Sequence, residues 1–257
     1  MLSEEEVLIN KLLVSEETQN TERYENKYLF KDHEKYRILS WLKSSKIGFR
    51  KHFEARKVSS IYFDSFDLKN YQANLNGDPN RIKPRLRWYN DDVLSTLSLE
   101  LKIKRGNRGF KHTVGIGLDA SPDNVENLFN FRAHNKILSL IQKNCSSESQ
   151  IFSYIRSKFP IVEVTYERCY FVGADSMIRA TLDTGIKYRS HGVGKSFLKS
   201  KNNVLEIKLP PTSDTRHIFQ NGKFPGRVFR NSKYCSAVSA TSRFLLTSKN
   251  WEDYIQP

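Results

Sequence analysis

The sequence contains little cysteine and no long apolar run. Its 257 residues include three cysteines, Cys145, Cys169 and Cys235, which share no metal-ligand spacing. So few cysteines, in odd number, indicate a reducing compartment rather than a disulfide framework. No apolar stretch approaches the roughly 20 residues of a membrane-spanning helix, and the acidic N-terminus lacks the cationic segment of a secretory signal. We therefore predict a cytoplasmic location, with attachment to the inner face of a membrane as the alternative.

Acidic residues are also in short supply. Lysine and arginine number 42 against 28 acids, so the formal net charge is +14. This charge predicts an anionic partner, such as nucleic acid, an anionic membrane surface or a polyphosphorylated small molecule. Six of the acids fall within residues 1–22, where Lys11 is the only base. We predict an acidic arm or amphipathic helix over 1–22, followed by one domain over 23–257.

The usual signatures of nucleotide binding and nucleophilic catalysis are missing. Gly194-Lys195-Ser196 ends like a phosphate-binding P-loop, but Arg189 stands where the first glycine belongs and no strand–loop–helix context surrounds it. The six histidines are scattered, and neither a Ser–His nor a Cys–His nucleophile set is evident.

A strict alternation of cationic and apolar residues is present instead. In the stretch 83–89, the side chains of Lys83, Arg85 and Arg87 share one face of a strand, and those of Leu86 and Trp88 share the other. The same alternation recurs over 23–28, 99–104, 178–183 and 205–209. One interpretation is an ordinary half-buried sheet whose polar face meets water. The other is a closed barrel whose cationic interior holds an anion of many charges, and the frequent arginines favour it because guanidinium groups match phosphate oxygens.

The order of elements favours an α+β fold, specifically a closed antiparallel β-barrel with covering helices and a C-terminal helix. Predicted strands cover 21–30, 58–64, 82–90, 97–104, 110–118, 161–172, 177–183, 185–188 and 204–209. Predicted helices cover 4–14, 32–43, 67–75, 121–143, 149–158 and 233–247, and residues 51–56 are predicted to be a connection. Asp67 is a candidate cap for the helix that follows it.

Eight motifs occur in a specific order. They are Arg23-Tyr24-Glu25-Asn26-Lys27-Tyr28, Ser60-Ile61-Tyr62-Phe63-Asp64, Lys83-Pro84-Arg85-Leu86-Arg87-Trp88-Tyr89, Leu99-Glu100-Leu101-Lys102, Tyr166-Glu167-Arg168, Arg179-Ala180-Thr181-Leu182-Asp183, Leu205-Glu206-Ile207-Lys208 and Ser232-Lys233-Tyr234-Cys235. Together they resemble the VTC domain, the polyphosphate polymerase branch of the triphosphate tunnel metalloenzymes. The resemblance runs from about Thr21 to Ser236.

The resemblance implies a basic tunnel in which the γ-phosphate of ATP is added to a growing polyphosphate chain, with Mn²⁺ or Mg²⁺ as cofactor. By motif, the substrate-binding residues are Lys27, Arg85, Arg87, Lys102, Lys111, Arg168, Arg179, Lys208, Ser232 and Lys233. Arg85, Arg87, Arg179 and Glu206 are the catalytic residues that it implies, with Glu206 as the metal ligand. Glu25 and Glu100 are expected to balance the basic lining, and Tyr62 and Asp64 to bond neighbouring basic side chains.

Other functions remain open on the sequence. The same scaffold could hydrolyse tripolyphosphate or a nucleoside triphosphate, or it could bind polyphosphate or inositol phosphates without catalysis. The expected partners are ATP and inorganic polyphosphate, and a membrane-protein partner is allowed because some relatives have one. A nucleic acid partner is not expected, because the sequence shows no series of aromatic stacking platforms.

Overall fold

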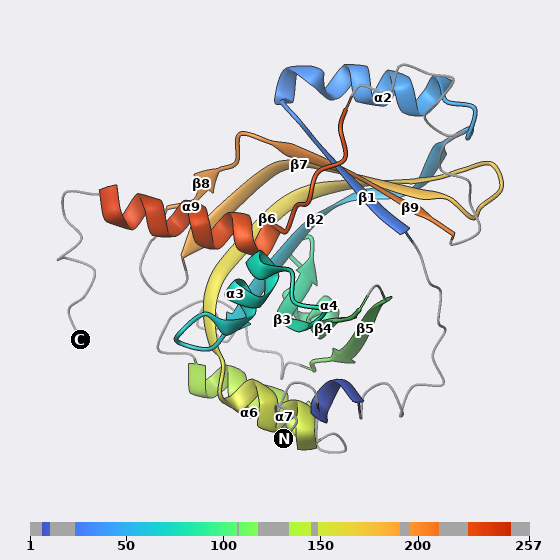
Figure 1. Cartoon of the computed structure of the whole chain (residues 1–257). Helices are drawn as coiled ribbons and strands as arrows, with labels where there is room; N and C mark the ends of the chain where they lie inside the picture. Colours follow the sequence, from blue (N-terminus) through green and yellow to red (C-terminus); the bar gives the residue numbers. More distant parts are fainter. Residues whose placement is uncertain are drawn as a thin grey trace.

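The computed structural model of the chain describes residues 7–10, 24–106, 108–117, 134–144, 149–190, 196–210 and 226–247, without the side chains of 94, 149 and 243–247 (Figure 1). The strands are β1 (Tyr24–Phe30), β2 (Arg50–Asp64), β3 (Asn80–Tyr89), β4 (Ser98–Arg105), β5 (Arg108–Gly115), β6 (Phe159–Val172), β7 (Arg179–Ser190), β8 (Leu198–Lys199) and β9 (Asn203–Leu209). The helices are η1 (Asp32–Glu34), α2 (Lys35–Ser44), α3 (Lys69–Asn76), α4 (Val93–Thr96), α6 (His134–Asn144), α7 (Ser149–Arg156) and α9 (Lys233–Thr247). In the described part of the chain, no helix has both the length and the apolar character needed to cross a bilayer.

One antiparallel sheet organises the molecule. Its strand order is β1-β9-β7-β6-β2-β3-β4-β5, and the short β8 pairs with β7. The pairing of β2 with β6 joins β2, β3, β4 and β5, which precede α6 and α7, to β6, β7 and β9, which follow them, and β1 pairs with β9 at the far edge. The α+β class predicted from the sequence is confirmed.

The predicted closed barrel is wrong. Among the described residues β1 and β5 are edge strands that do not pair with each other. The sheet nevertheless curls strongly, as the contact between Lys102 on β4 and Glu25 on β1 shows, with 3.2 Å between Nζ and the carboxylate. The free edge of β1 is occupied by the segment before α9: the Phe229 amide donates to the Lys27 carbonyl, and Val228 bridges Tyr28. Backbone groups engaged in this way cannot also close a barrel.

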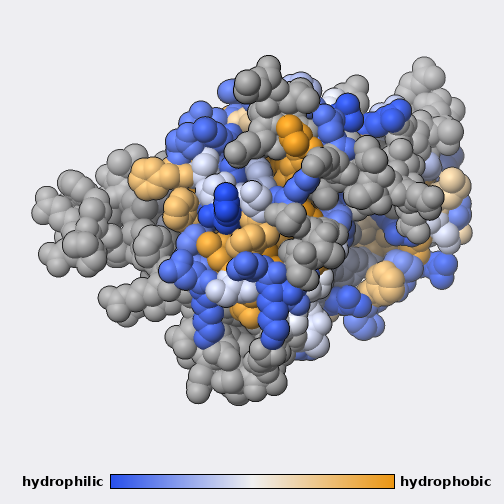
Figure 2. Space-filling model, turned by 90° about the horizontal axis from the view of Figure 1, so that it is seen from below, coloured by the Kyte–Doolittle hydropathy of each residue, from blue (hydrophilic) through white to orange (hydrophobic). Residues whose placement is uncertain are grey.

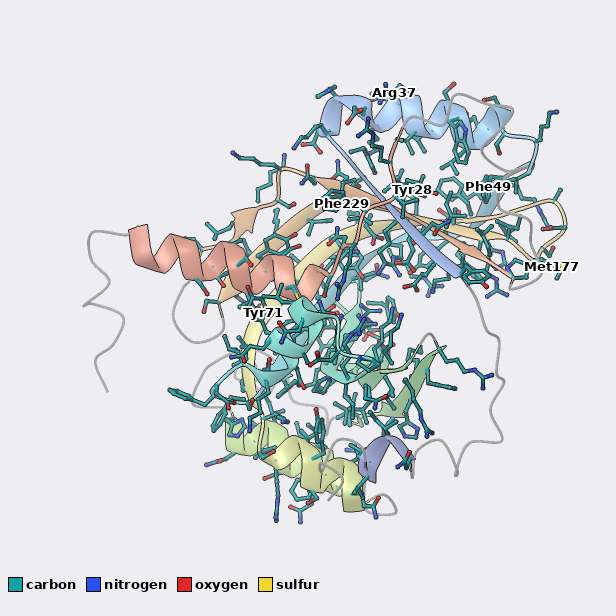
Figure 3. The ribbon with its side chains drawn as sticks, viewed as in Figure 1. Tyr28, Arg37, Phe49, Tyr71, Met177 and Phe229 are labelled. Carbon is teal, nitrogen blue, oxygen red and sulfur yellow. The ribbon has the colours of Figure 1, made fainter. Side chains whose placement is uncertain are left out.

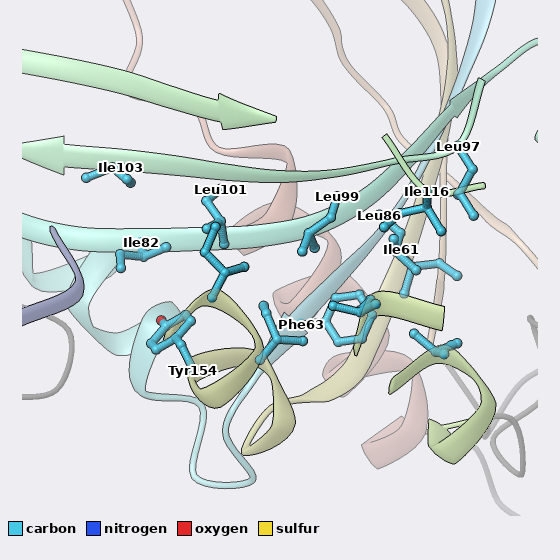
Figure 4. Packing of buried hydrophobic residues seen from close by; sticks show 14 of the residues in the cluster. Ile61, Phe63, Ile82, Leu86, Leu97, Leu99, Leu101, Ile103, Ile116 and Tyr154 are labelled. Carbon is cyan, nitrogen blue, oxygen red and sulfur yellow. The ribbon is translucent and has the colours of Figure 1, made fainter. Parts of the chain in front are cut away.

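The convex face of the sheet is apolar and covered by helices. α2 packs through Ile38, Trp41 and Leu42 on the part formed by β1, β9 and β7. α6, α7 and residues 7–10 cover β2, β3 and β4, whose buried side chains include Ile61, Phe63, Ile82, Leu86, Leu99, Leu101 and Ile103 (Figure 4). Seen from the side of α6 and α7, the described surface is largely hydrophilic with hydrophobic residues visible between the charged ones (Figure 2). The covering helices are therefore amphipathic, as their period predicts.

The concave face carries an apolar cluster where α9 lies against it. Tyr234, Ala237 and Val238 of α9 pack on a cluster that includes Val162 and Val164 of β6. Arg168 shares the strand parity of these two valines and lies on the same face, beyond the helix. The same face of β6 therefore carries valines beneath α9 and an arginine further along the strand, and no β-bulge in β6 is needed to place them together.

Local differences from the sequence predictions have simple causes. Residues 51–56, predicted to be a connection, belong to β2, whose first eight residues are all exposed and so lack an alternating burial signal. The two strands predicted over 177–188 are the single strand β7, in which Gly185 has a φ of 62° at a register shift against β6. The beginnings of the helices predicted at 4 and at 121 lie outside the described residues.

Candidate functional site

Antiparallel pairing brings the predicted cationic residues to one face. Lys83, Arg85 and Arg87 of β3 lie opposite Lys102, Glu100 and Ser98 of β4. Because directly opposed residues share a face of the sheet, the pairing identifies the residues of one face from each strand to the next. The predicted residues Lys27, Arg85, Arg87, Lys102, Lys111, Arg168, Arg179, Glu206 and Lys208 all lie on the concave face, and Ser232 and Lys233 stand where α9 begins. We call this set of residues the basic face.

Glu100 anchors the part of the basic face formed by β3, β4 and β5. Its carboxylate accepts from Arg85 at 2.5 and 2.8 Å and lies 3.5 Å from Arg87 and 3.3 Å from Lys111. Burial raises the pKa of Glu100, but the neighbouring cations outweigh it and lower the pKa to about 2. Glu100 therefore stays ionised and holds the Arg85 guanidinium by two hydrogen bonds, while Arg87, within ion-pairing distance of it, donates to Ser60 and Tyr166. These contacts with Arg85, Arg87 and Lys111 are the geometric basis for the charge balance expected of Glu100.

Asp183 anchors a second group of cations, on β6, β7 and α9. It is completely buried and accepts two hydrogen bonds from Arg168, at 2.6 and 2.7 Å, and one from Lys233 at 2.5 Å. Burial raises the pKa of Asp183, and the attraction of Arg168 and Lys233 lowers it below its usual value. This carboxylate ties the first residue of α9 to the sheet.

Glu206 and Glu25 form a third group, between β9, β1 and β4. Lys208 lies 3.4 Å from Glu206 and 3.6 Å from Glu25, and Lys27 lies 3.8 Å from Glu206 and 3.4 Å from Glu25. Burial raises the pKa of Glu206, but Lys27, Lys208 and Lys102 together hold it well below its usual range. Two ionised carboxylates thus share the same lysines.

Lys83 is a site residue that motif reasoning did not assign. Its ammonium lies 3.3 Å from the Ser232 hydroxyl, at the start of α9. Burial and the nearby Lys102, Lys27 and Arg81 lower the pKa of Lys83 to about 7, against the opposing effect of Cys235. Its parity with Arg85 and Arg87 was the sequence signal that could have identified it.

Arg179 differs from the other cations of this face. It is exposed, and among the described residues no carboxylate lies within ion-pairing distance of it. The register nevertheless places it directly opposite Lys208. Arg179 can therefore bind an anion without first breaking an internal ion pair.

Tyr62 and Asp64 have structural contacts, as expected, but only Tyr62 bonds a basic side chain. Its hydroxyl accepts from Arg85 at 3.1 Å. Asp64 instead accepts from the backbone amides of Asn70 and Tyr71 at 2.9 Å each, and from the Tyr234 hydroxyl. The expectation that Asp64 bonds basic side chains is wrong, and Asp64, rather than Asp67, caps the first turn of α3.

The donor chemistry fits a hard divalent cation bound together with phosphate. Within the described residues no three side chains from His, Cys, Asp and Glu converge as a complete metal cage. Glu206 is ionised, however, and Glu25 shares its lysine partners. Mg²⁺ and Mn²⁺ sites commonly use one or two carboxylates, with phosphate oxygens and water completing the shell. Glu206, with Glu25 beside it, has the charge and the oxygen donors for such a shared site.

Comparison with known proteins identifies the family. The VTC domain family model matches residues 22–242. The chain belongs to the VTC domain family. The resemblance read from the motifs is confirmed, and with it membership of the triphosphate tunnel superfamily. Members of this superfamily are typically phosphoryl-transfer enzymes or hydrolases. They act on triphosphates or nucleotides with a divalent metal.

One solved structure has a similar fold, and a second was also matched at a lower TM-score. HpAC1 from Hippeastrum, described as an adenylyl cyclase candidate with a dominant triphosphatase activity, is 14% identical, with a TM-score of 0.51 over 85% of this chain and 96% of that one. The PH1819 protein from Pyrococcus horikoshii OT3 is 12% identical, with a TM-score of 0.42 over 86% of this chain and 100% of that one. No curated protein matches the chain.

Proposed function

We propose that this VTC domain is a polyphosphate polymerase that transfers the γ-phosphate of ATP to the end of an inorganic polyphosphate chain. The observation that carries the proposal is the basic face itself. Cations from β1, β3, β4, β5, β6, β7, β9 and α9 face one concavity, and among the described residues the carboxylates that pair with them are Glu25, Glu100, Asp183 and Glu206. A linear anion with one charge or more on each phosphate group matches such a surface better than a compact monoanion does.

The carboxylates prepare the cations for this task. Glu100 fixes Arg85, and Asp183 fixes Arg168 and Lys233, before any substrate arrives. Donors fixed in this way need no reorganisation as charge develops during phosphoryl transfer. Catalysis of this kind requires positioning and charge neutralisation more than covalent participation by the protein. The scarcity of nucleophilic sets in the sequence is consistent with that requirement.

The proposed reaction has a simple balance of bonds. A terminal phosphate oxygen of the polyphosphate chain attacks the γ-phosphorus of ATP, the bond from that phosphorus to the β–γ bridging oxygen breaks, and ADP leaves. Arg85, Arg87 and Arg179 donate to the oxygens of the transferred group, and Lys27, Lys102, Lys111, Arg168, Lys208, Ser232 and Lys233 hold the flanking phosphates. A divalent metal held by Glu206 and phosphate oxygens would neutralise charge on the donor and the leaving group.

Hydrolysis is the second candidate, because HpAC1, whose fold is similar, is described as a triphosphatase. On the same basic face, water would then replace the end of the polyphosphate chain as the attacking group. The two reactions need the same cations and the same metal, and they differ only in the acceptor. A membrane-protein partner that receives the product remains part of the polymerase proposal, as in some relatives.

One assay separates the candidates. The protein is incubated with ATP and Mn²⁺ or Mg²⁺, and the products are resolved by gel electrophoresis and phosphate release. Long chains with stoichiometric ADP support the polymerase, orthophosphate without chains supports the hydrolase, and the absence of turnover with retained tripolyphosphate binding supports a binding module.

Two variants make this assay specific for the site. We expect Glu206→Gln to abolish turnover while tripolyphosphate still binds without metal. Glu163→Gln is the matched control, because Glu163 is also buried and ion-paired, in its case with Arg189, but has the opposite strand parity. Full turnover by Glu206→Gln would contradict the proposed metal site.

A further inference from the structure

Three aromatic rings surround one arginine next to the basic face. The guanidinium carbon of Arg56 lies 5.7 Å from the ring centroid of Phe53, 5.9 Å from that of Tyr89 and 5.9 Å from that of Tyr170. Phe53 and Tyr170 also meet edge to face, with 5.9 Å between centroids. We call these four residues, which come from β2, β3 and β6, the Arg56 cluster.

The Arg56 cluster exposes both an aromatic ring and a cation. The Phe53 side chain is large and apolar, yet it is 48% exposed. The His52 ring lies against it, 3.9 Å between centroids. In the described part of the chain, no carboxylate lies within ion-pairing distance of Arg56, which is itself exposed. An exposed planar aromatic ring beside an unneutralised planar cation is a surface suited to stacking.

The strand register places the cluster beside the phosphate-binding cations. Arg56 lies opposite Arg168, and Phe53 lies opposite Tyr170, two residues further along β6. Tyr89 follows Arg87 by two residues, so the two side chains share the concave face. The cluster occupies the end of this face away from α9, toward the β6–β7 hairpin. Phe49 and Met177, labelled in Figure 3, mark that end.

We propose that the Arg56 cluster binds the base of a nucleoside triphosphate, with the base stacked on Phe53 and Arg56 and the triphosphate extending to Arg168 and Arg87. This inference rests on the proposed function and adds a second subsite to it. A planar base has a π-face that stacks on aromatic rings and on guanidinium planes. The subsite would let the protein distinguish ATP, which carries a base, from a polyphosphate chain, which does not.

The test compares two ligands that differ in the base. Dissociation constants for ATP and for tripolyphosphate are measured by titration calorimetry without metal, on the wild type, Phe53→Ala and Arg56→Lys. We expect Phe53→Ala to weaken ATP binding by about five- to tenfold, since stacking contributes on the order of 1 kcal/mol or more for each base. Tripolyphosphate binding should stay within about twofold, because the ring interacts with the base and not with phosphates. Arg56→Lys keeps the charge and loses the planar group, so it should show the same selective loss.

Phe66→Ala is the matched control. Phe66 is 92% exposed and lies just beyond the other end of β2, so both ligands should bind this variant as they bind the wild type. Unchanged ATP binding by Phe53→Ala, or an equal loss for both ligands, would overturn the base subsite and leave the phosphate site intact. A wild-type protein that binds neither ligand would instead overturn the proposed function.

Discussion

Leu101 and Lys102 are neighbours on β4, and they illustrate how differently the two faces of the sheet are built. Leu101 is completely buried on the convex face, whereas the Lys102 side chain is 44% exposed on the concave face. The convex face gains stability from apolar area removed from water beneath α2, α6 and α7. The concave face is held together by carboxylates that offset crowded cations. The convex face therefore stabilises the fold, whereas the crowded cations of the concave face lower the stability that the convex face provides.

Breaking a buried anchor of the concave face should have the largest effect. We expect Asp183→Ala to lower the free energy of unfolding by about 3–5 kcal/mol, because Arg168 and Lys233 are left buried without their counter-ion. Urea denaturation measures the change. Asp91→Ala is the control, because Asp91 pairs with Lys57 at an exposed position and an exposed pair contributes at most about 1 kcal/mol. Equal effects of the two substitutions would contradict the anchoring role.

Leu101→Ala tests the convex face. We expect a loss of about 2–5 kcal/mol in unfolding free energy, from lost burial and the cavity that remains. Lys102→Ala should change stability by less than about 1 kcal/mol, because the Lys102–Glu25 pair is partly exposed, yet it should weaken tripolyphosphate binding. Denaturation and titration of both variants give the comparison. The division between the faces fails if Lys102→Ala destabilises the fold as much as Leu101→Ala does.

Arg179→Ala should separate function from stability within the concave face. Arg179 is exposed and has no carboxylate partner among the described residues, so unfolding should shift by no more than about 0.5 kcal/mol. Turnover should fall by roughly 100-fold, the usual cost of losing a donor to the transition state. Arg156→Ala, an exposed arginine on α7 over the convex side, should retain full activity. Normal turnover by Arg179→Ala would remove Arg179 from the site.

Lys83 should give the basic face a modest pH dependence. Its pKa of about 7 in the folded protein is below the ordinary 10.5, so the unfolded chain binds more protons between these values and stability rises with pH across that window. Ligand affinity should change in the opposite direction, because Lys83 loses its charge as the pH rises through 7.

Comparison of the wild type with Lys83→Arg measures this effect. The arginine stays charged, so the loss of tripolyphosphate affinity between pH 6 and pH 8 should be several-fold smaller in the variant. The ligand's own titration is the same in both proteins and cancels in the ratio of dissociation constants. Identical slopes would show that Lys83 does not sense the phosphate.

Much of the fold and site was predictable because strand alternation is a local property. The parity of Lys83, Arg85 and Arg87 in the chain became their shared face in the sheet. The first half of β2 was missed because Arg50–Lys57 is exposed on both faces, and no periodic burial marks it. Asp64 was assigned the wrong partners because the α3 amides and Tyr234, which it bonds, come from other elements.

The sequence by itself determined the class of fold, the family and the identity of the cations, since each follows from alternation and from motifs within single strands. Only the tertiary structure decided which cations are neutralised, that the sheet curls without closing, and that Phe53, Arg56, Tyr89 and Tyr170 meet. These outcomes depend on the pairing of strands distant in the chain and on which segment occupies the edge of β1. Such contacts are set by long-range packing, which no local pattern of residues encodes.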